Sequence, residues 1–234
     1  MDKLTNKVCE LIEKEPMQQL IFASSLYQQI SSEVSEALYY KILERMTKRG
    51  TLLRLARGIY YRPLCNKFGT VPFGEKEILQ HFVSNGKGVV IGYRLYNRLG
   101  LTTQVGKNAE AYTNLIEGEE KTVGSVHFRK LNLFLTKEMA SVIEVLEVLE
   151  NYFKIEDLNK EAFGKFMREF CAQYSDEAVQ NVLAHIKYKK STIAFLKCFL
   201  DYFGVENTLN KYLSPLSVYR IADMEDFYES ARAS

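Results

Sequence analysis

The residues best suited to bind a ligand are cations concentrated in residues 33–62, a stretch with seven Lys or Arg and three Glu. Lys41, Arg45 and Lys48 recur at positions i, i+4 and i+7, which places them on one face of a helix. A row of ammonium and guanidinium groups matches the phosphates that flank a groove of double-stranded DNA. The spacing therefore predicts a DNA-binding face.

Two further cations, Arg54 and Arg57, follow in the segment after this row. Lys and Arg also solvate ordinary surface helices, so the row alone would indicate no more than an exposed face. Because the following segment is basic too, and few acids interrupt it, we favour DNA binding. Tyr40, next to the row, is predicted to stack or to hydrogen-bond a phosphate, although a lone aromatic residue is as often used for packing.

A helix and a hairpin must position these cations. The helix runs up to Gly50, a residue type that ends helices in the left-handed conformation. Residues 51–55 and 59–62 are β-prone and are predicted to pair through an Ala56-Arg57-Gly58 loop. The other helix face carries the apolar residues Tyr39, Ile42, Leu43 and Met46. A basic hairpin directly after a helix predicts the recognition helix and wing of a winged helix-turn-helix.

The preceding residues have the element order of such a domain. Residues 3–14 form an amphipathic helix pattern, and the apolar run 20–23 is predicted to pair with the hairpin as a third strand. Ser24 or Ser25 is expected to cap a short second helix. We predict a winged helix-turn-helix DNA-binding domain over residues 1–67, followed by a linker between Pro63 and Pro72.

The rest of the chain, residues 68–234, is predicted to be a second domain. Its first part, residues 68–135, shows short helical and strand-like runs and is predicted to be mixed α/β. From residue 136 the apolar period is helical throughout, which predicts a C-terminal helical bundle over 136–234. The predicted fold class is therefore α+β, mainly helical.

Two polar groups in this second domain need an interpretation. Thr102-Thr103-Gln104 lies between a predicted helix and the strands, where loop residues often carry function. An equally good interpretation is a connection stabilised by Thr side chains that bond the backbone. Glu144, Glu147 and Glu150 are spaced three residues apart on a predicted helix, and we interpret them as a solvated face.

No residues are spaced for catalysis or for metal binding. His81, His127 and His185 lie far apart, and none has Cys, Asp or Glu at metal-ligand spacing. We predict no catalytic residues, no metal and no cofactor, and therefore no enzyme. Because the net charge is only +2, the positive charge for DNA binding must be concentrated in one region. We also expect a soluble cytoplasmic protein, because the cysteines are scattered, the start does not resemble a signal peptide and no apolar run is long enough to span a membrane.

Several short sequence motifs resemble those of the AbiE-type antitoxin family of bacterial type IV toxin–antitoxin systems, and the resemblance covers roughly residues 8–148. These motifs are Arg57-Gly58-Ile59-Tyr60, the run from Gly69 to Pro72, and Leu99-Gly100-Leu101-Thr102-Thr103-Gln104-Val105. The resemblance implies an N-terminal winged helix that represses its own operon. It also implies a C-terminal domain that counteracts a nucleotidyltransferase-like toxin without a stable complex. The helical region after Asn151 does not match the family.

The resemblance makes Thr102, Thr103 and Gln104 candidates for the antitoxin surface. The expected DNA partner is an operator with inverted repeats, because one winged helix reads few base pairs. Either two copies bind the repeats cooperatively, or the C-terminal helices form a homodimer. Two alternatives stay open: a winged-helix protein-interaction scaffold or regulator without an antitoxin role, and an enzyme whose pocket gathers ionisable groups that the sequence does not link.

Overall fold

The computed structural model describes residues 3–222, and this part of the chain contains nine α-helices and nine strands. The chain is thus mixed α and β, as the sequence predicts at this level. Its contacts divide it into two compact units. The first unit extends to residue 81 and includes residues 122–126, and the second contains residues 82–121 and the chain from residue 127 onward. No helix between residues 3 and 222 is long and apolar enough to cross a bilayer.

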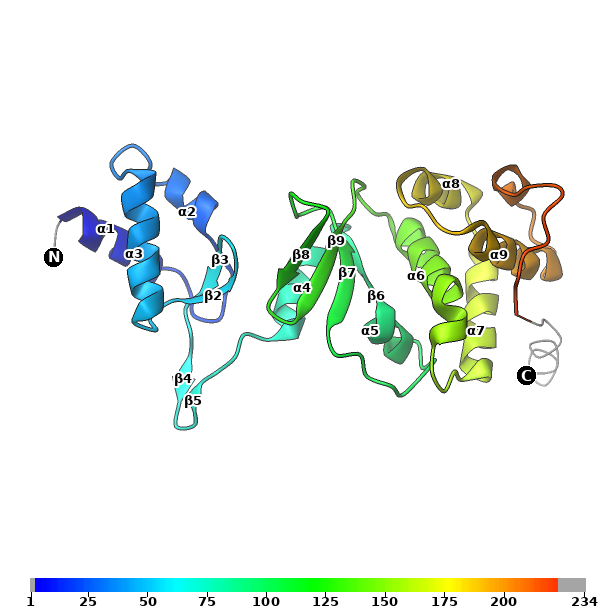
Figure 1. Ribbon diagram of the computed structural model, residues 1–234, viewed down its shortest axis with the longest axis horizontal. Coiled ribbons are helices and arrows are strands. Elements are labelled where there is room, and N and C mark those ends of the chain that lie inside the picture. Colours follow the sequence, from blue (N-terminus) through cyan, green and yellow to red (C-terminus); the bar gives the residue numbers. More distant parts are fainter. Residues whose placement is uncertain (1–2, 223–234) are drawn as a thin grey trace. The chain divides into compact units, whose positions relative to one another are not determined.

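The first unit begins with three helices around a small sheet (Figure 1). The sheet has the order β1-β3-β2, and both strand pairs are antiparallel. Ile21 lies opposite Tyr60, which confirms the predicted third strand beside the hairpin. The elements are α1 (Lys3–Glu13), β1 (Ile21–Phe22), α2 (Ala23–Gln28), α3 (Glu36–Lys48), β2 (Leu53–Ala56) and β3 (Ile59–Tyr61).

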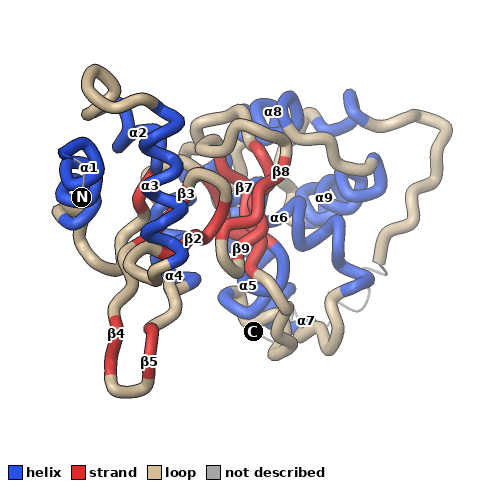
Figure 2. Tube along the Cα trace, turned by 60° about the vertical axis from the view of Figure 1, so that its left-hand side comes forward, coloured by secondary structure: helices blue, strands red, loops and turns tan. Residues whose placement is uncertain are grey.

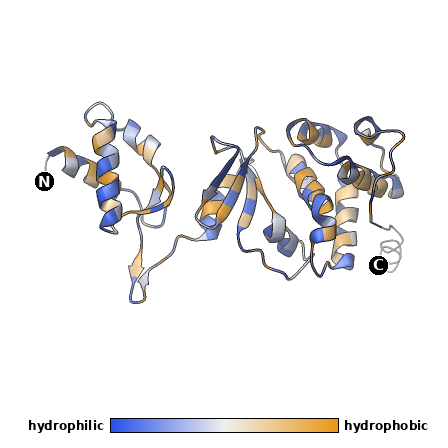
Figure 3. Cartoon of the chain, in the orientation of Figure 1, coloured by the Kyte–Doolittle hydropathy of each residue, from blue (hydrophilic) through white to orange (hydrophobic). Residues whose placement is uncertain are grey.

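The amphipathic pattern of α3 determines which face it buries. Its predicted apolar row, Tyr39, Ile42, Leu43 and Met46, is buried, and hydrophilic and hydrophobic residues alternate along the helix in Figure 3. The Tyr39 hydroxyl donates a hydrogen bond of 3.0 Å to the Ala23 carbonyl of α2. Gly50 follows the helix with φ +75°, the left-handed conformation that its residue type predicts. The orientation of the basic face of α3 is therefore fixed by core packing.

Two local predictions in this unit are wrong. The helix α2 begins at Ala23, and its N-cap is Phe22 rather than Ser24 or Ser25. Strand β1 runs directly into α2, so the Ala23 amide is satisfied by the Gly58 carbonyl at 2.9 Å instead of by a serine side chain. The hairpin loop is also shorter than predicted, because Ala56 pairs with Ile59 after a bulge in β2.

The predicted linker between Pro63 and Pro72 contains a small hairpin, β4 (Cys65–Asn66) and β5 (Gly69–Thr70). Its base closes with a hydrogen bond of 2.8 Å from the Val71 amide to the Leu64 carbonyl. The Gln18 amide donates to the Val71 carbonyl at 3.1 Å and ties the hairpin to the first unit.

Helix α4 (Glu75–Val83) follows, within the part of the chain where short helical runs are predicted. His81 of this helix lies with its ring centroid 4.9 Å from that of Phe22 in β1. This contact and the Gln18 bond place residues 68–81 with the first unit, although the sequence predicts the domain boundary after residue 67.

A four-stranded sheet of order β6-β7-β9-β8, shown in red in Figure 2, belongs mainly to the second unit, although residues 122–126 around the β8–β9 turn are part of the first. Strand β6 pairs antiparallel with β7, in a register that places Val89 opposite Tyr112. A short helix, α5, follows β6 without a loop. The elements are β6 (Gly88–Ile91), α5 (Gly92–Arg98), β7 (Ala109–Thr113), β8 (Glu120–Val123) and β9 (Val126–Lys130).

Helix α6 lies at the centre of the second unit, where it packs against β6, α5 and the other three long helices. The predicted helices after residue 136 are present as far as Tyr212, whereas residues 213–222 form no helix and residues 223–234 of the prediction lie outside the described residues. Asn159 and Ser175 cap the helices that follow them, each accepting a backbone N–H. The elements are α6 (Lys137–Asn151), η1 (Tyr152–Lys154), α7 (Lys160–Ala172), α8 (Asp176–His185), α9 (Lys190–Tyr202) and η2 (Leu209–Tyr212).

Asp176 at the start of α8 should make the stability of the second unit depend on pH. Burial by itself raises the pKa of this carboxyl, but hydrogen bonds from Thr208, Tyr174 and Gln180 outweigh it and lower the pKa from 3.8 to about 2. A lowered folded-state pKa stabilises the fold above the unfolded value, and this stabilisation is lost as pH falls from 3.8 towards 2. Urea unfolding across this pH window should show the loss in the wild type and a flatter profile in Asp176→Asn. Equal slopes for the two proteins would contradict the assignment.

Candidate nucleic-acid interface

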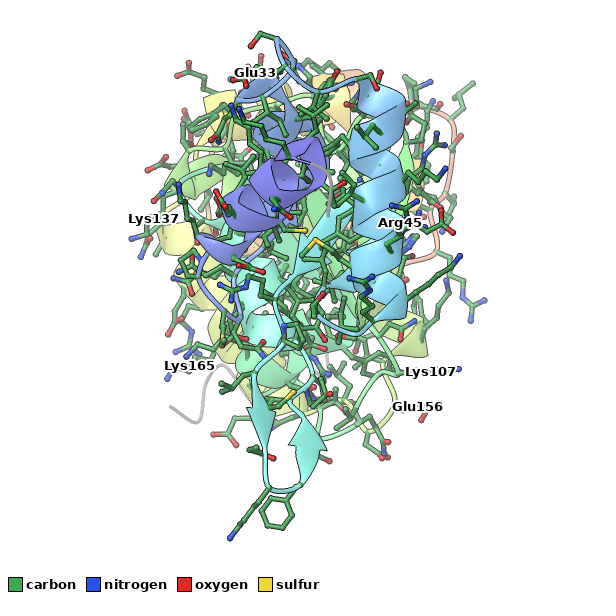
Figure 4. All side chains as sticks on the ribbon, turned by 90° about the vertical axis from the view of Figure 1, so that its left-hand side faces the viewer. Glu33, Arg45, Lys107, Lys137, Glu156 and Lys165 are labelled. Carbon is green, nitrogen blue, oxygen red and sulfur yellow. The ribbon has the colours of Figure 1, made fainter. Side chains whose placement is uncertain are left out.

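All five cations predicted to contact DNA are exposed in the first unit. Lys41, Arg45 and Lys48 lie along the solvent side of α3, and Figure 4 marks Arg45 on this helix. Arg54 and Arg57 are exposed on the β2–β3 hairpin. The hairpin follows α3 after a short turn, so the fold brings both basic groups into one region.

Most of these cations are free of ion pairs. Within residues 3–222, no ion pair holds Lys41, Arg45 or Arg57. Lys48 is paired with Glu44 one turn away at 2.7 Å, and this hydrogen bond lowers the pKa of the Glu44 carboxyl. Both side chains of that pair are largely exposed, so the pair contributes little to stability and a phosphate can replace the carboxylate at small cost.

A groove of about 560 Å³ lies between α3 and the hairpin. Tyr40, Glu44 and Thr47 line it from the helix, and Arg54 and Arg57 line it from the hairpin. These helix residues stand one position before the basic row, so the two rows are rotated by about 100° around the helix axis. The groove therefore separates the hairpin arginines from the cations of α3, an arrangement that spacing along the sequence does not show.

Tyr40 faces this groove. Its ring packs edge-on against Tyr39 with 5.3 Å between centroids, and 37% of the residue remains exposed. Burial and the nearby Glu36 raise the pKa of its hydroxyl, whereas Arg57 acts in the opposite direction. The phenol is therefore a neutral hydrogen-bond donor beside the hairpin. Its ring packs against Tyr39, and its exposed part is accessible to a ligand in the groove.

Hydrogen bonds to neighbouring segments hold the loop that contains Thr102, Thr103 and Gln104 in the second unit. The Thr102 side chain is buried and donates to the Glu156 carbonyl at 2.7 Å. The Gln104 side chain donates to Asp157 at 2.8 Å, and Asn97 donates to the carbonyls of residues 102 and 104. These bonds give Thr102 and Gln104 a structural role, and Thr103 is the member of the three whose side chain is exposed.

The interpretation of Glu144, Glu147 and Glu150 as a solvated face is wrong. Glu147 is only 5% exposed and lies among the buried residues of α6. Its carboxylate accepts hydrogen bonds from two tyrosines that are distant in the sequence, Tyr112 and Tyr188. Spacing along α6 could not reveal these partners. A glutamate flanked by Leu146 and Val148 was the available signal.

Residues 7–133 match the model of DUF6088, a family of unknown function. No curated protein matches the chain. Among solved structures, the chain is similar to the crystal structure of the Rv2827c protein from Mycobacterium tuberculosis, with a TM-score of 0.47 and 12% sequence identity. The similarity covers 85% of this chain and 76% of that protein.

Proposed function

We propose that this chain, which belongs to the DUF6088 family of unknown function, is a sequence-specific DNA-binding protein that uses its first unit as a winged helix. In this proposal α3 is the recognition helix and the β2–β3 hairpin is the wing. The observation that carries the proposal is the row of exposed α3 cations, two of them without ion pairs, beside a hairpin with two more exposed arginines. Such free cations are what phosphate neutralisation requires.

The dimensions of α3 suit the major groove. Its 13 residues give a helix of about 20 Å, and the groove is about 12 Å wide and admits one helix. With α3 inserted, Lys41 and Arg45 reach one flanking backbone, while Arg57 reaches the other strand or the adjacent minor groove. Glu44 then faces base edges, where a carboxylate accepts a hydrogen bond from cytosine N4. Specific contacts and phosphate contacts are thereby supplied by neighbouring rows of one helix.

The decisive experiment neutralises the α3 row in the full chain. Each lost phosphate contact lowers the salt slope of log K by about 0.9, so the triple variant Lys41→Gln, Arg45→Gln and Lys48→Gln should lose between two and three units. Fluorescence anisotropy with duplex DNA from upstream of the gene, titrated across a salt series, measures this slope.

A matched control removes the same charge elsewhere in the first unit. Lys3→Gln, Lys14→Gln and Lys67→Gln together change exposed lysines outside α3 and β2–β3. This control should keep the wild-type slope. An α3 variant with unchanged affinity, or an equal loss in the control, would remove α3 from the interface.

We further propose that the protein represses its own operon and serves as the antitoxin for a nucleotidyltransferase-like toxin. This part rests on the resemblance of the Arg57–Tyr60 and Leu99–Val105 motifs to AbiE-type antitoxins. Within the second motif, Thr103 and Val105 have exposed side chains and are the candidate antitoxin surface.

The genomic neighbourhood and a co-expression assay test this role. An operator with inverted repeats and an adjacent nucleotidyltransferase gene are expected, and co-expression should relieve growth arrest by that enzyme. A protein-interaction scaffold would have neither the operator nor the adjacent nucleotidyltransferase gene. If co-expression with the native neighbour does not relieve growth arrest, the antitoxin proposal is wrong and only the DNA-binding proposal remains.

A further inference from the structure

We propose that a cavity in the second unit binds a small zwitterion of amino-acid size, whose ammonium group contacts Glu147 and whose acid group contacts Lys154. The cavity has a volume of about 350 Å³, which is within the usual range for sites that bind small molecules. It is lined by residues of α5, β7, β9, α6 and η1, all of them within the second unit. The inference is independent of the proposed DNA binding, which uses residues of the first unit.

Glu147 is the anchor of the site. Although the residue is 95% buried, it lines the cavity. The hydroxyls of Tyr112 and Tyr188 both donate to its Oε1 atom, at 3.2 and 3.1 Å. Among the described residues, no side chain or backbone group donates to its Oε2 atom. Two tyrosines therefore hold one carboxylate oxygen of Glu147, and the other oxygen has no donor from the described part of the protein.

A buried carboxylate with an open oxygen is costly unless something compensates it. Burial raises the pKa of Glu147, while bonds from Tyr188 and Tyr112 and the charge of Arg129 act against this rise. Arg129 does not complete the compensation, because its guanidinium pairs with Glu110 at 3.0 Å. A cationic group from a ligand would supply both the missing donor and the missing charge.

The walls of the cavity determine what else the ligand carries. Its charged lining consists of two carboxylates, Glu110 and Glu147, and two cations, Arg129 and Lys154. A ligand with only negative charge would face both carboxylates, and one with only positive charge would leave Lys154 unmatched. Lys154 is exposed and forms no ion pair with any residue in the described part of the chain. A zwitterion satisfies both ends of the site.

Spacing along α6 and η1 sets the size of the ligand. Four residues of α-helix and three of 3₁₀ helix lead from Glu147 to Lys154, so the two charged residues are separated by about 12 Å of helix rise. The long lysine side chain extends over part of this gap, and in the proposed complex the ligand spans the rest. Tyr93 and Tyr96 of α5 lie 5.6 Å apart in an edge-to-face pair and offer an aromatic wall for an ammonium group or an apolar side chain.

The test is calorimetric titration of the full chain with each standard L-amino acid. For any amino acid that binds, the N-acetyl derivative removes the ammonium charge and the decarboxylated amine removes the acid. We expect both derivatives to bind at least about tenfold more weakly than the zwitterion. If no amino acid binds, or if the derivatives bind as well as the parent, the proposal is overturned. Binding of nucleoside monophosphates in place of amino acids would overturn it as well.

Two variants tie the binding to this cavity. Glu147→Gln keeps an acceptor for both tyrosines but removes the charge, and Lys154→Met removes the second anchor from an exposed position. Each should weaken the zwitterion by at least about tenfold, whereas Lys137→Met, an exposed lysine at the start of α6, should bind as the wild type does. Unchanged affinity in Lys154→Met, which removes no buried contact, contradicts the proposal even if Glu147→Gln fails to fold.

Discussion

Replacing Tyr39 by alanine is expected to destabilise the first unit strongly and to abolish the proposed DNA binding. The side chain is fully buried, and its ring centroid lies 5.2 Å from that of Tyr27. Truncating a buried aromatic residue costs about 3–5 kcal/mol, a large part of the free energy of unfolding of a small domain. Thermal unfolding followed by circular dichroism should show an earlier transition, and anisotropy should detect no specific binding.

Tyr39→Phe is the matched control for this prediction. It keeps the ring and removes only the hydroxyl that donates to the Ala23 carbonyl. Ala23 is fully buried, so water cannot replace the hydroxyl that its carbonyl loses, and the free energy of unfolding should fall by about 1–3 kcal/mol. DNA binding should survive below the unfolding transition. Specific binding retained by Tyr39→Ala would mean that α3 does not need its core contacts to present the basic row.

The parts of the fold that the sequence predicted correctly have strong short-range periodicity. The buried row of α3 repeats every three or four residues, and Gly50 marks its end by residue type. The β2–β3 hairpin was recognisable because Gly58 ends the loop between two β-prone runs, and in the structure this glycine has φ +75°. These signals depend on residues within one or two turns of each other, so they survive without knowledge of the tertiary structure.

The β4–β5 hairpin could not be predicted in the same way. All of its residues are exposed, so neither strand shows the alternation of apolar and polar residues that indicates a buried face. Two prolines flank it and give the appearance of a linker. Its position depends instead on the Gln18 side chain, which is 53 residues away from its partner Val71.

The candidate interface was predictable as a set of residues but not as an arrangement. Helical spacing correctly grouped Lys41 and Arg45, and hairpin sequence grouped Arg54 with Arg57. The groove between the two groups depends on how α3 is rotated against the sheet. The bond from Tyr39 to Ala23 and the bond from Ala23 to Gly58 fix that rotation, and both are long-range.

Replacing Phe163 by alanine is expected to destabilise the second unit by about 3–5 kcal/mol while the proposed DNA binding remains. Phe163 in α7 is fully buried, and its ring centroid lies 5.1 Å from that of Tyr152 and 5.6 Å from that of Phe199. The two units have separate cores, since the buried cluster around Phe163 contains no residue of the cluster around Tyr39. Calorimetry should show one transition shifted to lower temperature and the other unchanged.

Phe134→Ala serves as the control, because this phenylalanine is 66% exposed and its loss should change stability little. Anisotropy measured between the two transitions, where the second unit is unfolded and the first is still folded, then separates two outcomes for Phe163→Ala. Full affinity with unchanged cooperativity would assign DNA binding to the first unit alone. Reduced cooperativity of DNA binding, with the unfolding transition of the first unit unchanged, would instead show that the C-terminal helices hold two copies together on inverted repeats. Phe163 lies in the second unit, so its loss can affect binding to the operator only through association of the second units.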